Sequence, residues 1–386
     1  MRLGSCVPFA QATTLLAYFT HVTVSEPTAR RLTERAGAAY AAAQTAEAAR
    51  IEREAPPPPQ GPPVLLLSAD GAMVPLVGGA WGEVKTLAIG EVEPDPDAPG
   101  EVGATGLSYF SRRAAAESFT RLALVETHRR GVETAGLVGL VVDGSDWCQG
   151  VGDVHRPDAV RILDHGHAVG YLATAAQATF GAGTAETSAW VGKQAHRLKH
   201  GAPRTVLRAL AELPAAAATD PAAAAAARDV ATGYLAARWE QIQYARFRKL
   251  GLPIGSGAVE SANKLVVEAR LKGAGMHWAE AHVDPMVALR TVVCADRWAE
   301  AWPPITRELR AQARRRTQER RRARRPAPPP PPAVAPPGRL APVPRPAPSG
   351  HPKLVVDGRP TAAHPWKRSC RSRSQPAHPA ATTTEL

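Results

Sequence analysis

The sequence contains no long apolar run. Nowhere in its 386 residues is there a stretch approaching the roughly 20 consecutive apolar residues that cross a bilayer. The beginning, Met1–Val7, carries one arginine and lacks an apolar core followed by a cleavage site. We therefore predict neither a signal peptide nor a membrane partner.

Cysteine is also scarce. The four cysteines are Cys6, Cys148, Cys294 and Cys370, and no two of them form a Cys-x-x-Cys pair. This spacing argues against a structural zinc site and against a secreted fold held by disulfides. The expected compartment is the cytoplasm, in association with the nucleoid.

Negative charge is scarce at one end of the chain. The whole sequence holds 47 Lys and Arg and 35 Asp and Glu; residues 305–386 hold 18 and 4 of these, a net charge of +14. Residues 1–304 hold the other 29 and 31, a net charge of −2. With 17 of the 37 prolines, 305–386 is predicted to be a basic, Pro/Arg-rich disordered tail. Such excess positive charge favours nucleic acid as a partner.

Residues 1–50 are predicted to be helical. Ser25-Glu26-Pro27 is typical of a helix start, because Ser caps helices and Pro is tolerated in the first turn. The pattern of helix, short turn and helix fits a helix-turn-helix and fits a plain helical hairpin equally well. The prolines in 51–63 indicate a stiff linker.

The following region is predicted to form a mixed α/β sheet with flanking helices. Strands are expected at Val64–Asp70, Ala72–Val77, Trp81–Val92, Leu137–Gly144 and Ala159–Asp164. The first two would pair across a turn at Asp70-Gly71, 95–106 would be a loop, and 112–130 would be a helix. Alanine-rich 173–250 is predicted to be an all-helical insertion, so the core would comprise 64–172 and 251–304.

Three acidic residues stand out in this core. Asp70 and Asp143 each end an apolar segment and precede a glycine, and Glu260 follows Gly255-Ser256-Gly257 at a predicted helix start. Carboxylates that converge repel each other unless a cation offsets their charge. Together they are candidates to hold two Mg²⁺ (or Mn²⁺) ions about 4 Å apart, as in-line phosphoryl displacement requires. Asp-Gly is also a common turn signal, so each aspartate has a turn role as its alternative.

A further acidic segment is Asp164-His165-Gly166-His167. Asp164 with His167 three residues later fits a metal site, a helix cap or a polar contact that orients an active centre. Basic residues around the predicted Glu260 helix are candidates to contact DNA phosphates: Arg246, Arg248, Lys264, Arg270 and Lys272. The aromatic residues interleaved with arginines over 234–248 fit either DNA contact or the core face of a helix.

Several segments together resemble a bacterial insertion-sequence DDE transposase of the ISKra type, allied to the Mutator-like superfamily. The resembling segments are Pro8–Gly37, Ser68–Val92, Asp143–Leu172, Gly251–Trp302 and the ending Gly358–Arg368. The most specific part is Gly-Ser-Gly-x-Val-Glu followed by Lys-Gly-Ala-Gly-Met-x-Trp.

The resemblance implies an RNase H-like core interrupted by the all-α insertion. It implies Asp70, Asp143 and Glu260 as the catalytic, metal-binding triad, with Asp164 and His167 as a supporting D-x-x-H pair. In a rival assignment, Asp164 is the second triad acid; Asp143 is favoured because it ends the longer apolar segment. The implied partner is double-stranded DNA, both terminal inverted repeats and target, bound by a homo-oligomer.

The predicted function is Mg²⁺-dependent DNA strand cleavage and strand transfer of an insertion sequence. A contrasting hypothesis is a catalytically inactive, truncated transposase remnant that only binds DNA, through the N-terminal helices and the basic tail. A third is an RNase H-like nuclease that cuts without strand transfer. Metal-dependent cleavage separates the second hypothesis from the others, and strand transfer separates the third from the first.

Overall fold

A computed structural model describes residues 1–98, 100–214, 218–323, 355–361 and 364. The chain divides into two compact units, Met1–Arg325 and Pro326–Leu386. Within the second unit, the described residues include a short antiparallel hairpin of β6 (Val355–Val356) and β7 (Arg359–Pro360). Most of the predicted tail and part of the Gly358–Arg368 ending lie outside the described residues. All further elements belong to the first unit.

A five-stranded mixed sheet forms the centre of this unit, in the order β3-β2-β1-β4-β5. Its strands are β1 (Val64–Pro75), β2 (Trp81–Pro94), β3 (Val102–Arg112), β4 (Leu137–Val142) and β5 (Val160–Leu163). The first three pair antiparallel, whereas β1, β4 and β5 run parallel. The predicted mixed α/β sheet with flanking helices is confirmed at this level.

Two strand predictions are wrong. No turn occurs at Asp70-Gly71: β1 is one strand of 12 residues, and Asp70 and Gly71 pair with Thr86 and Lys85 of β2. The chain reverses instead at Gly78 and Gly79, which both have positive φ angles that glycine tolerates. The predicted loop over 95–106 ends early, because β3 begins at Val102 and pairs along β2.

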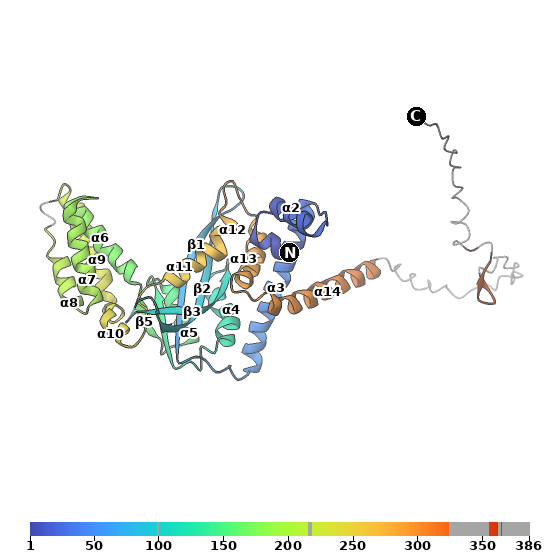
Figure 1. Cartoon of the computed structure of the whole chain (residues 1–386), viewed down its shortest axis with the longest axis horizontal. Coiled ribbons are helices and arrows are strands. Elements are labelled where there is room, and N and C mark those ends of the chain that lie inside the picture. Colours follow the sequence, from blue (N-terminus) through green and yellow to red (C-terminus); the bar gives the residue numbers. More distant parts are fainter. Residues whose placement is uncertain (99, 215–217, 324–354, 362–363, 365–386) are drawn as a thin grey trace, which may run out of the picture. The chain divides into compact units, whose positions relative to one another are not determined.

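Both faces of the sheet are covered by helices (Figure 1). On one face, Leu65, Leu67 and Phe110 pack against α4 (Ala116–Arg129) and α5 (Asp146–His155). On the other, Val74 and Val84 pack against α11 (Gly257–Ala262) and α13 (Glu280–Cys294). A π-helical segment (Asn263–Glu268) and α12 (Ala269–Leu271) continue directly from α11. Alternate side chains of β1 thus enter different cores, as strand geometry requires.

The described residues of the predicted insertion, 173–250, form helices joined by turns and short irregular segments and include no strand, but the first of these helices already begins at His165. Its helices are α6 (His165–Phe180), α7 (Ala185–Lys199), α8 (Pro203–Ala211), α9 (Pro221–Ala237), the 3₁₀ turn Trp239–Ile242 and α10 (Tyr244–Lys249). They form the green-to-yellow bundle beside β5 in Figure 1. Leu172 and Leu235 of the bundle share one buried cluster with Val141 and Ile162 of the sheet, so the bundle and the sheet are continuous.

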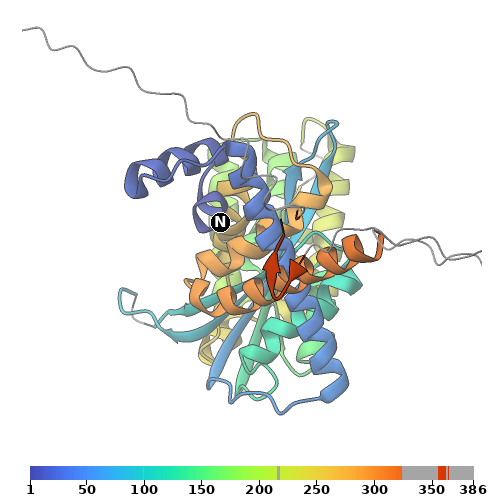
Figure 2. The ribbon, with the colours of Figure 1, turned by 90° about the vertical axis from the view of Figure 1, so that its right-hand side faces the viewer.

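The N-terminal segment consists of α1 (Arg2–Cys6), α2 (Phe9–Thr20) and α3 (Glu26–Glu54). Helix α3 is 29 residues long and packs along α13 and α14 (Trp298–Ala323) (Figure 2). The first residues of the predicted 51–63 linker belong to α3, which ends at Glu54. The end of the linker is fixed by a hydrogen bond of 2.8 Å, in which Gly61 N–H donates to Thr134 Oγ1.

Helix α14 corrects the expectation that disorder starts at residue 305. The structure describes a helix through Ala323, which is anchored by Ala301 and Ile305 in a core shared with α3 and α13. Beyond this buried start, its arginines are exposed. The described residues contain no helix with both the length and the apolar character that a membrane crossing needs.

Candidate active site

The three acidic residues come from three elements that meet on one side of the sheet. Asp70 lies on β1, Asp143 directly follows β4, and Glu260 lies on α11. Strands β1 and β4 are parallel neighbours paired with Leu67 opposite Leu140, a register that, continued, brings Asp143 beside Asp70. Topology alone therefore places two carboxylates together, whereas α11 arrives only after the whole helical insertion.

The surroundings of Asp70 combine burial with nearby negative charge. The pKa of Asp70 is raised from its ordinary value, chiefly because burial penalises the charged form. The negative charges of Asp143 and Glu260 raise it further. Hydrogen bonds from Gly71 N–H and from the Asn263 amide oppose the rise without cancelling it. A cation bound among these groups would relieve this repulsion.

Asn263 is a member of this site that sequence reasoning missed. Its Nδ2 donates to Asp70 Oδ2 at 2.8 Å, and its Oδ1 is buried without a hydrogen-bond partner among the described residues. It follows Glu260 by three residues, which puts both on one helix face. The three-residue spacing from Glu260 could have identified Asn263 as a neighbour of Glu260. It could not have shown that Asn263 hydrogen-bonds to Asp70.

The loop after β4 is held by the helical insertion. Asp143 Oδ1 accepts from Ser145 N–H at 2.9 Å, and the Asp143 carbonyl accepts from the Tyr234 hydroxyl of α9 at 2.5 Å. Arg238 Nη2 donates to the Gly144 carbonyl at 2.9 Å. Gly144 has a φ of +85°, which favours glycine, and a side chain there would collide with Tyr234.

Asp164 has a different environment. It is 6% exposed, and its two oxygens accept from different backbone N–H groups: His167 at 2.6 Å, which caps α6, and Ser256 at 2.7 Å. Ser256 in turn donates its hydroxyl to Glu260 Oε1 at 2.8 Å. Asp164 therefore ties the start of the insertion to the loop that presents Glu260, and Asp143 is the acid beside Asp70.

His167 lies among aromatic rings and not against an acid. Its ring is 5.7 Å from that of Tyr171 and 6.4 Å from that of Tyr234, both at an angle.

Among the described residues, no group of three or more His, Cys, Asp or Glu side chains is placed so as to hold a metal ion together.

The predicted phosphate-binding residues divide into exposed and engaged side chains. Arg246 and Lys264 are exposed, and neither side chain forms an ion pair with any described residue. Arg248 pairs with Glu101 at 2.9 Å. Lys272 is exposed and pairs with Glu268 at 2.6 Å.

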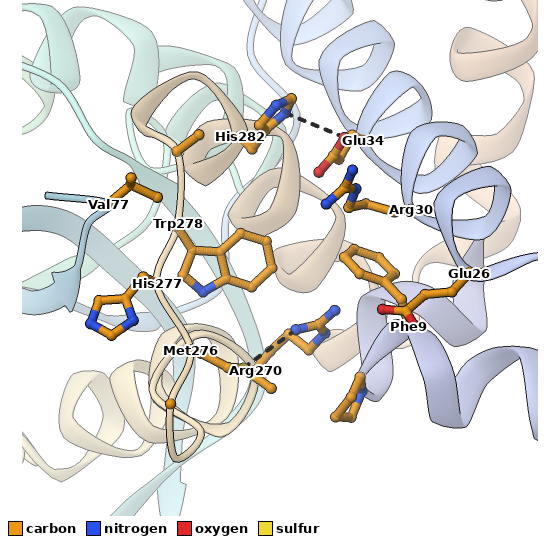
Figure 3. Close-up of a pocket in the computed structure, with 13 residues that line it drawn as sticks. Phe9, Glu26, Arg30, Glu34, Val77, Arg270, Met276, His277, Trp278 and His282 are labelled. Carbon is orange, nitrogen blue, oxygen red and sulfur yellow. Dashed lines mark hydrogen bonds and ion pairs between the residues drawn. The ribbon is translucent and has the colours of Figure 1, made fainter.

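Arg270 departs from the expectation, because it is only 2% exposed. Figure 3 shows its side chain between α2, which carries Phe9, and the segment that carries Trp278. Its guanidinium lies 4.7 Å from the Phe9 ring and 5.1 Å from the Trp278 ring, and donates to the Gly4 carbonyl. Burial lowers its pKa to about 10, so it stays charged at neutral pH. In this arrangement Arg270 docks α1 on the core and does not face a phosphate.

The interleaved aromatics likewise enter the interior. Tyr244 and Phe247 are 0% and 2% exposed, and the Tyr244 hydroxyl donates to the Leu163 carbonyl at 2.9 Å. Tyr244 and Phe247 therefore lie on the core face of the helix. Tyr234 instead hydrogen-bonds to the backbone at Asp143.

Comparison with known proteins identifies no family. No protein-family model matches the sequence, and no curated protein matches it either.

Proposed function

We propose that this chain is a DDE transposase that cleaves and joins the DNA of an insertion sequence. The observation that carries the proposal is the convergence of three elements on Asp70: the register of β1 and β4 brings Asp143 beside it, and Asn263, one helical turn after Glu260, donates to its carboxylate. Carboxylates that perturb one another within one site are a mark of functional positions.

The architecture supports an RNase H-like core. Three antiparallel strands are followed by two parallel ones, and the acids lie on the central strand, after its parallel neighbour and on the helix that follows the insertion. This is the arrangement that the resemblance to ISKra-type transposases implies. The insertion is therefore expected to bring Glu260 back to the strands that carry Asp70 and Asp143.

The donor set fits Mg²⁺ or Mn²⁺. Asp70, Asp143 and Glu260 would hold the metal through carboxylate oxygens, which these ions prefer, and Asn263 Oδ1 is an unpartnered oxygen beside them. When bound, such ions activate a water or a 3′-hydroxyl and stabilise the attacking and leaving oxygens of phosphoryl transfer.

The remaining residues orient the acids and attract DNA. Ser256 and Asp164 fix the loop that presents Glu260, and the Tyr234 hydroxyl fixes the backbone at Asp143. Arg246 and Lys264 offer exposed cations to the phosphates. We expect a homo-oligomer to assemble on the two element ends.

The test is cleavage by the purified full-length chain of DNA that carries the ends of its own element, with Mg²⁺. Asp143→Asn and Glu260→Gln are each expected to lower the cleavage rate at least about 100-fold, because loss of one charged ligand weakens the metal site. Asp153→Asn is the matched control, since Asp153 is an exposed acid paired with Arg161.

The same assay separates the rival functions. Undiminished cleavage by both variants would remove these acids from the mechanism. Salt-dependent DNA binding by the wild-type chain without metal-dependent cleavage would select an inactive DNA-binding remnant. Cleavage without joining of the freed 3′-hydroxyl to target DNA would select a nuclease.

A further inference from the structure

A groove of about 670 Å³ opens beside Glu260 between two helices of the insertion. It is lined by Asp164, His167 and Tyr171 at the start of α6, by Ala226 and Val230 of α9, and by Glu260 itself. The groove therefore begins at Glu260, one of the proposed catalytic carboxylates, and extends between helices of the bundle, where the proposed chemistry uses no side chain of its lining.

Tyr171, which lines this groove, belongs to an aromatic stack. The Tyr171 ring stacks on the Tyr234 ring at 4.0 Å and 16°, and the Arg238 guanidinium lies 3.7 Å from the Tyr234 ring. Tyr234 is fixed by its bond to the Asp143 carbonyl, and Arg238 by its bond to the Gly144 carbonyl. The Tyr171 ring is thus braced on one face by Tyr234, which is itself held by the loop of Asp143, and it also lines the groove.

The charge of the lining limits what the groove can hold. No lysine or arginine lines it, and its acids are Glu260 and Asp164, the latter engaged by backbone N–H groups. A phosphate would find no cation in the groove, whereas a flat, neutral ring would find a tyrosine face. The His167 ring, 5.7 Å from Tyr171, adds imidazole nitrogens that can meet the polar edge of such a ring.

We propose that this groove receives an unpaired base of the DNA strand being cut, stacked on Tyr171. The inference rests on the proposed function, which brings a DNA strand to Glu260. A phosphate at the carboxylate cluster leaves the attached base free to enter the neighbouring groove once it is unpaired. Stacking on a fixed aromatic ring repays part of the cost of unpairing that base.

The test compares two fluorescent 12-nucleotide strands, oligothymidylate and an abasic strand with the same phosphates, by anisotropy without added metal. The wild-type full chain is expected to bind oligothymidylate at least about five-fold more tightly, the effect of stacking one base. Tyr171→Ala is expected to remove this preference and Tyr171→Phe to keep it. Ala226→Leu, which narrows the groove without adding an aromatic ring and leaves the stack intact, is expected to lower it as well.

Tyr18→Ala is the matched control, because Tyr18 is a tyrosine of α2 with 76% exposure and should leave the preference unchanged. Equal binding of both strands by the wild-type chain would overturn the inference, as would a preference that is undiminished in Tyr171→Ala and Ala226→Leu. A change of oligomeric state in those two variants, with no base preference in the wild type, would assign the groove to a second copy. Because the assay needs neither metal nor cleavage, its failure is distinct from a failure of the catalytic proposal.

Discussion

The carboxylate of Asp164 is buried and bound at both oxygens, whereas that of Asp143 is half-buried and accepts one backbone N–H. These surroundings assign different work to the two residues. Both carboxylate oxygens of Asp164 accept hydrogen bonds that join two segments of the chain. Asp143 has an oxygen left that could bind a metal ion, because Ser145 N–H engages only its Oδ1.

Asp164→Asn is therefore expected to cost more stability than Asp143→Asn. The amide introduced at position 164 would keep one acceptor and leave either His167 N–H or Ser256 N–H facing an NH₂ group, at a cost of about 1–3 kcal/mol. The amide introduced at position 143 keeps the acceptor that Ser145 uses, so its cost should stay below about 1 kcal/mol. Urea denaturation measures both, and equal costs would contradict the separate roles.

His155 is expected to make stability depend on pH. Burial lowers its pKa below the ordinary value of 6.5, and Thr120 and Thr127 hold its ring nitrogens. The unfolded chain then binds more protons as the pH falls below about 6.5, so this histidine destabilises the folded chain in that range. His155→Gln should flatten the slope of the free energy of unfolding between about pH 5 and pH 7; an identical slope would refute the prediction.

At the scale of elements, the contact of α3 with α13 depends on one glycine. A side chain at Gly37 would collide with the backbone of Pro285, which is inside α13. Gly37→Ala is expected to lower the free energy of unfolding by about 1–3 kcal/mol, because backbone cannot yield as a side chain can. Gly233→Ala on α9, where the new methyl meets nothing within 4 Å, should instead stabilise by about 0.5–1 kcal/mol. Similar effects of both substitutions on thermal unfolding would show that α3 does not depend on this close contact.

Helix α14 carries a cluster of exposed arginines. Arg307, Arg310 and Arg314 lie on one side of it, and the described residues provide none of them with an ion-pair partner. We expect Arg310→Gln with Arg314→Gln to weaken binding to a non-specific DNA duplex. If each residue meets one phosphate, the slope of log K against log[salt] should fall in magnitude by about 2. Arg208→Gln, an exposed arginine on α8, is the control, and an unchanged slope in the double variant would exclude α14 from the DNA contact.

At the scale of the whole molecule, positive charge and acidic chemistry are separated. Residues 1–304 carry a net charge of −2, whereas 305–386 carry +14. If the chain binds DNA as proposed, we expect phosphate attraction to depend largely on residues 305–386, and metal binding to depend on acids of residues 1–304. The two expectations can be measured separately. The salt dependence of DNA binding tests the role of residues 305–386, and the metal dependence of cleavage tests the role of the acids in residues 1–304.

Metal binding is expected to stabilise the folded chain as a whole. A ligand that binds only the folded state adds about 2.7 kcal/mol at 100 times its Kd, so millimolar Mg²⁺ should raise the melting temperature. Glu260→Gln should reduce that rise, and Asp153→Asn, which changes a distant exposed acid, should preserve it. Equal shifts in all three chains would place the Mg²⁺ elsewhere.

Much of the candidate site was predictable, because a carboxylate next to an apolar run is a local pattern. Asp70 and Asp143 are identified by the segments Val64–Asp70 and Leu137–Gly144, and Glu260 by the glycines before its helix. Asn263 and the buried state of Arg270 were not predictable, since their partners Asp70 and Gly4 lie 193 and 266 residues away.

The sequence by itself determined the α/β class, the helical insertion and the candidate acids, because periodicity and propensity act over neighbouring residues. Only the tertiary structure decided that Asp70 lies inside β1, that 102–112 is a strand and that α14 runs to Ala323. Pairing with β2 and packing against α3 impose these outcomes on segments whose local pattern favours a turn, a loop or disorder. The same long-range contacts make Asp143 a neighbour of Asp70 and turn Asp164 into the tie that holds the loop of Glu260.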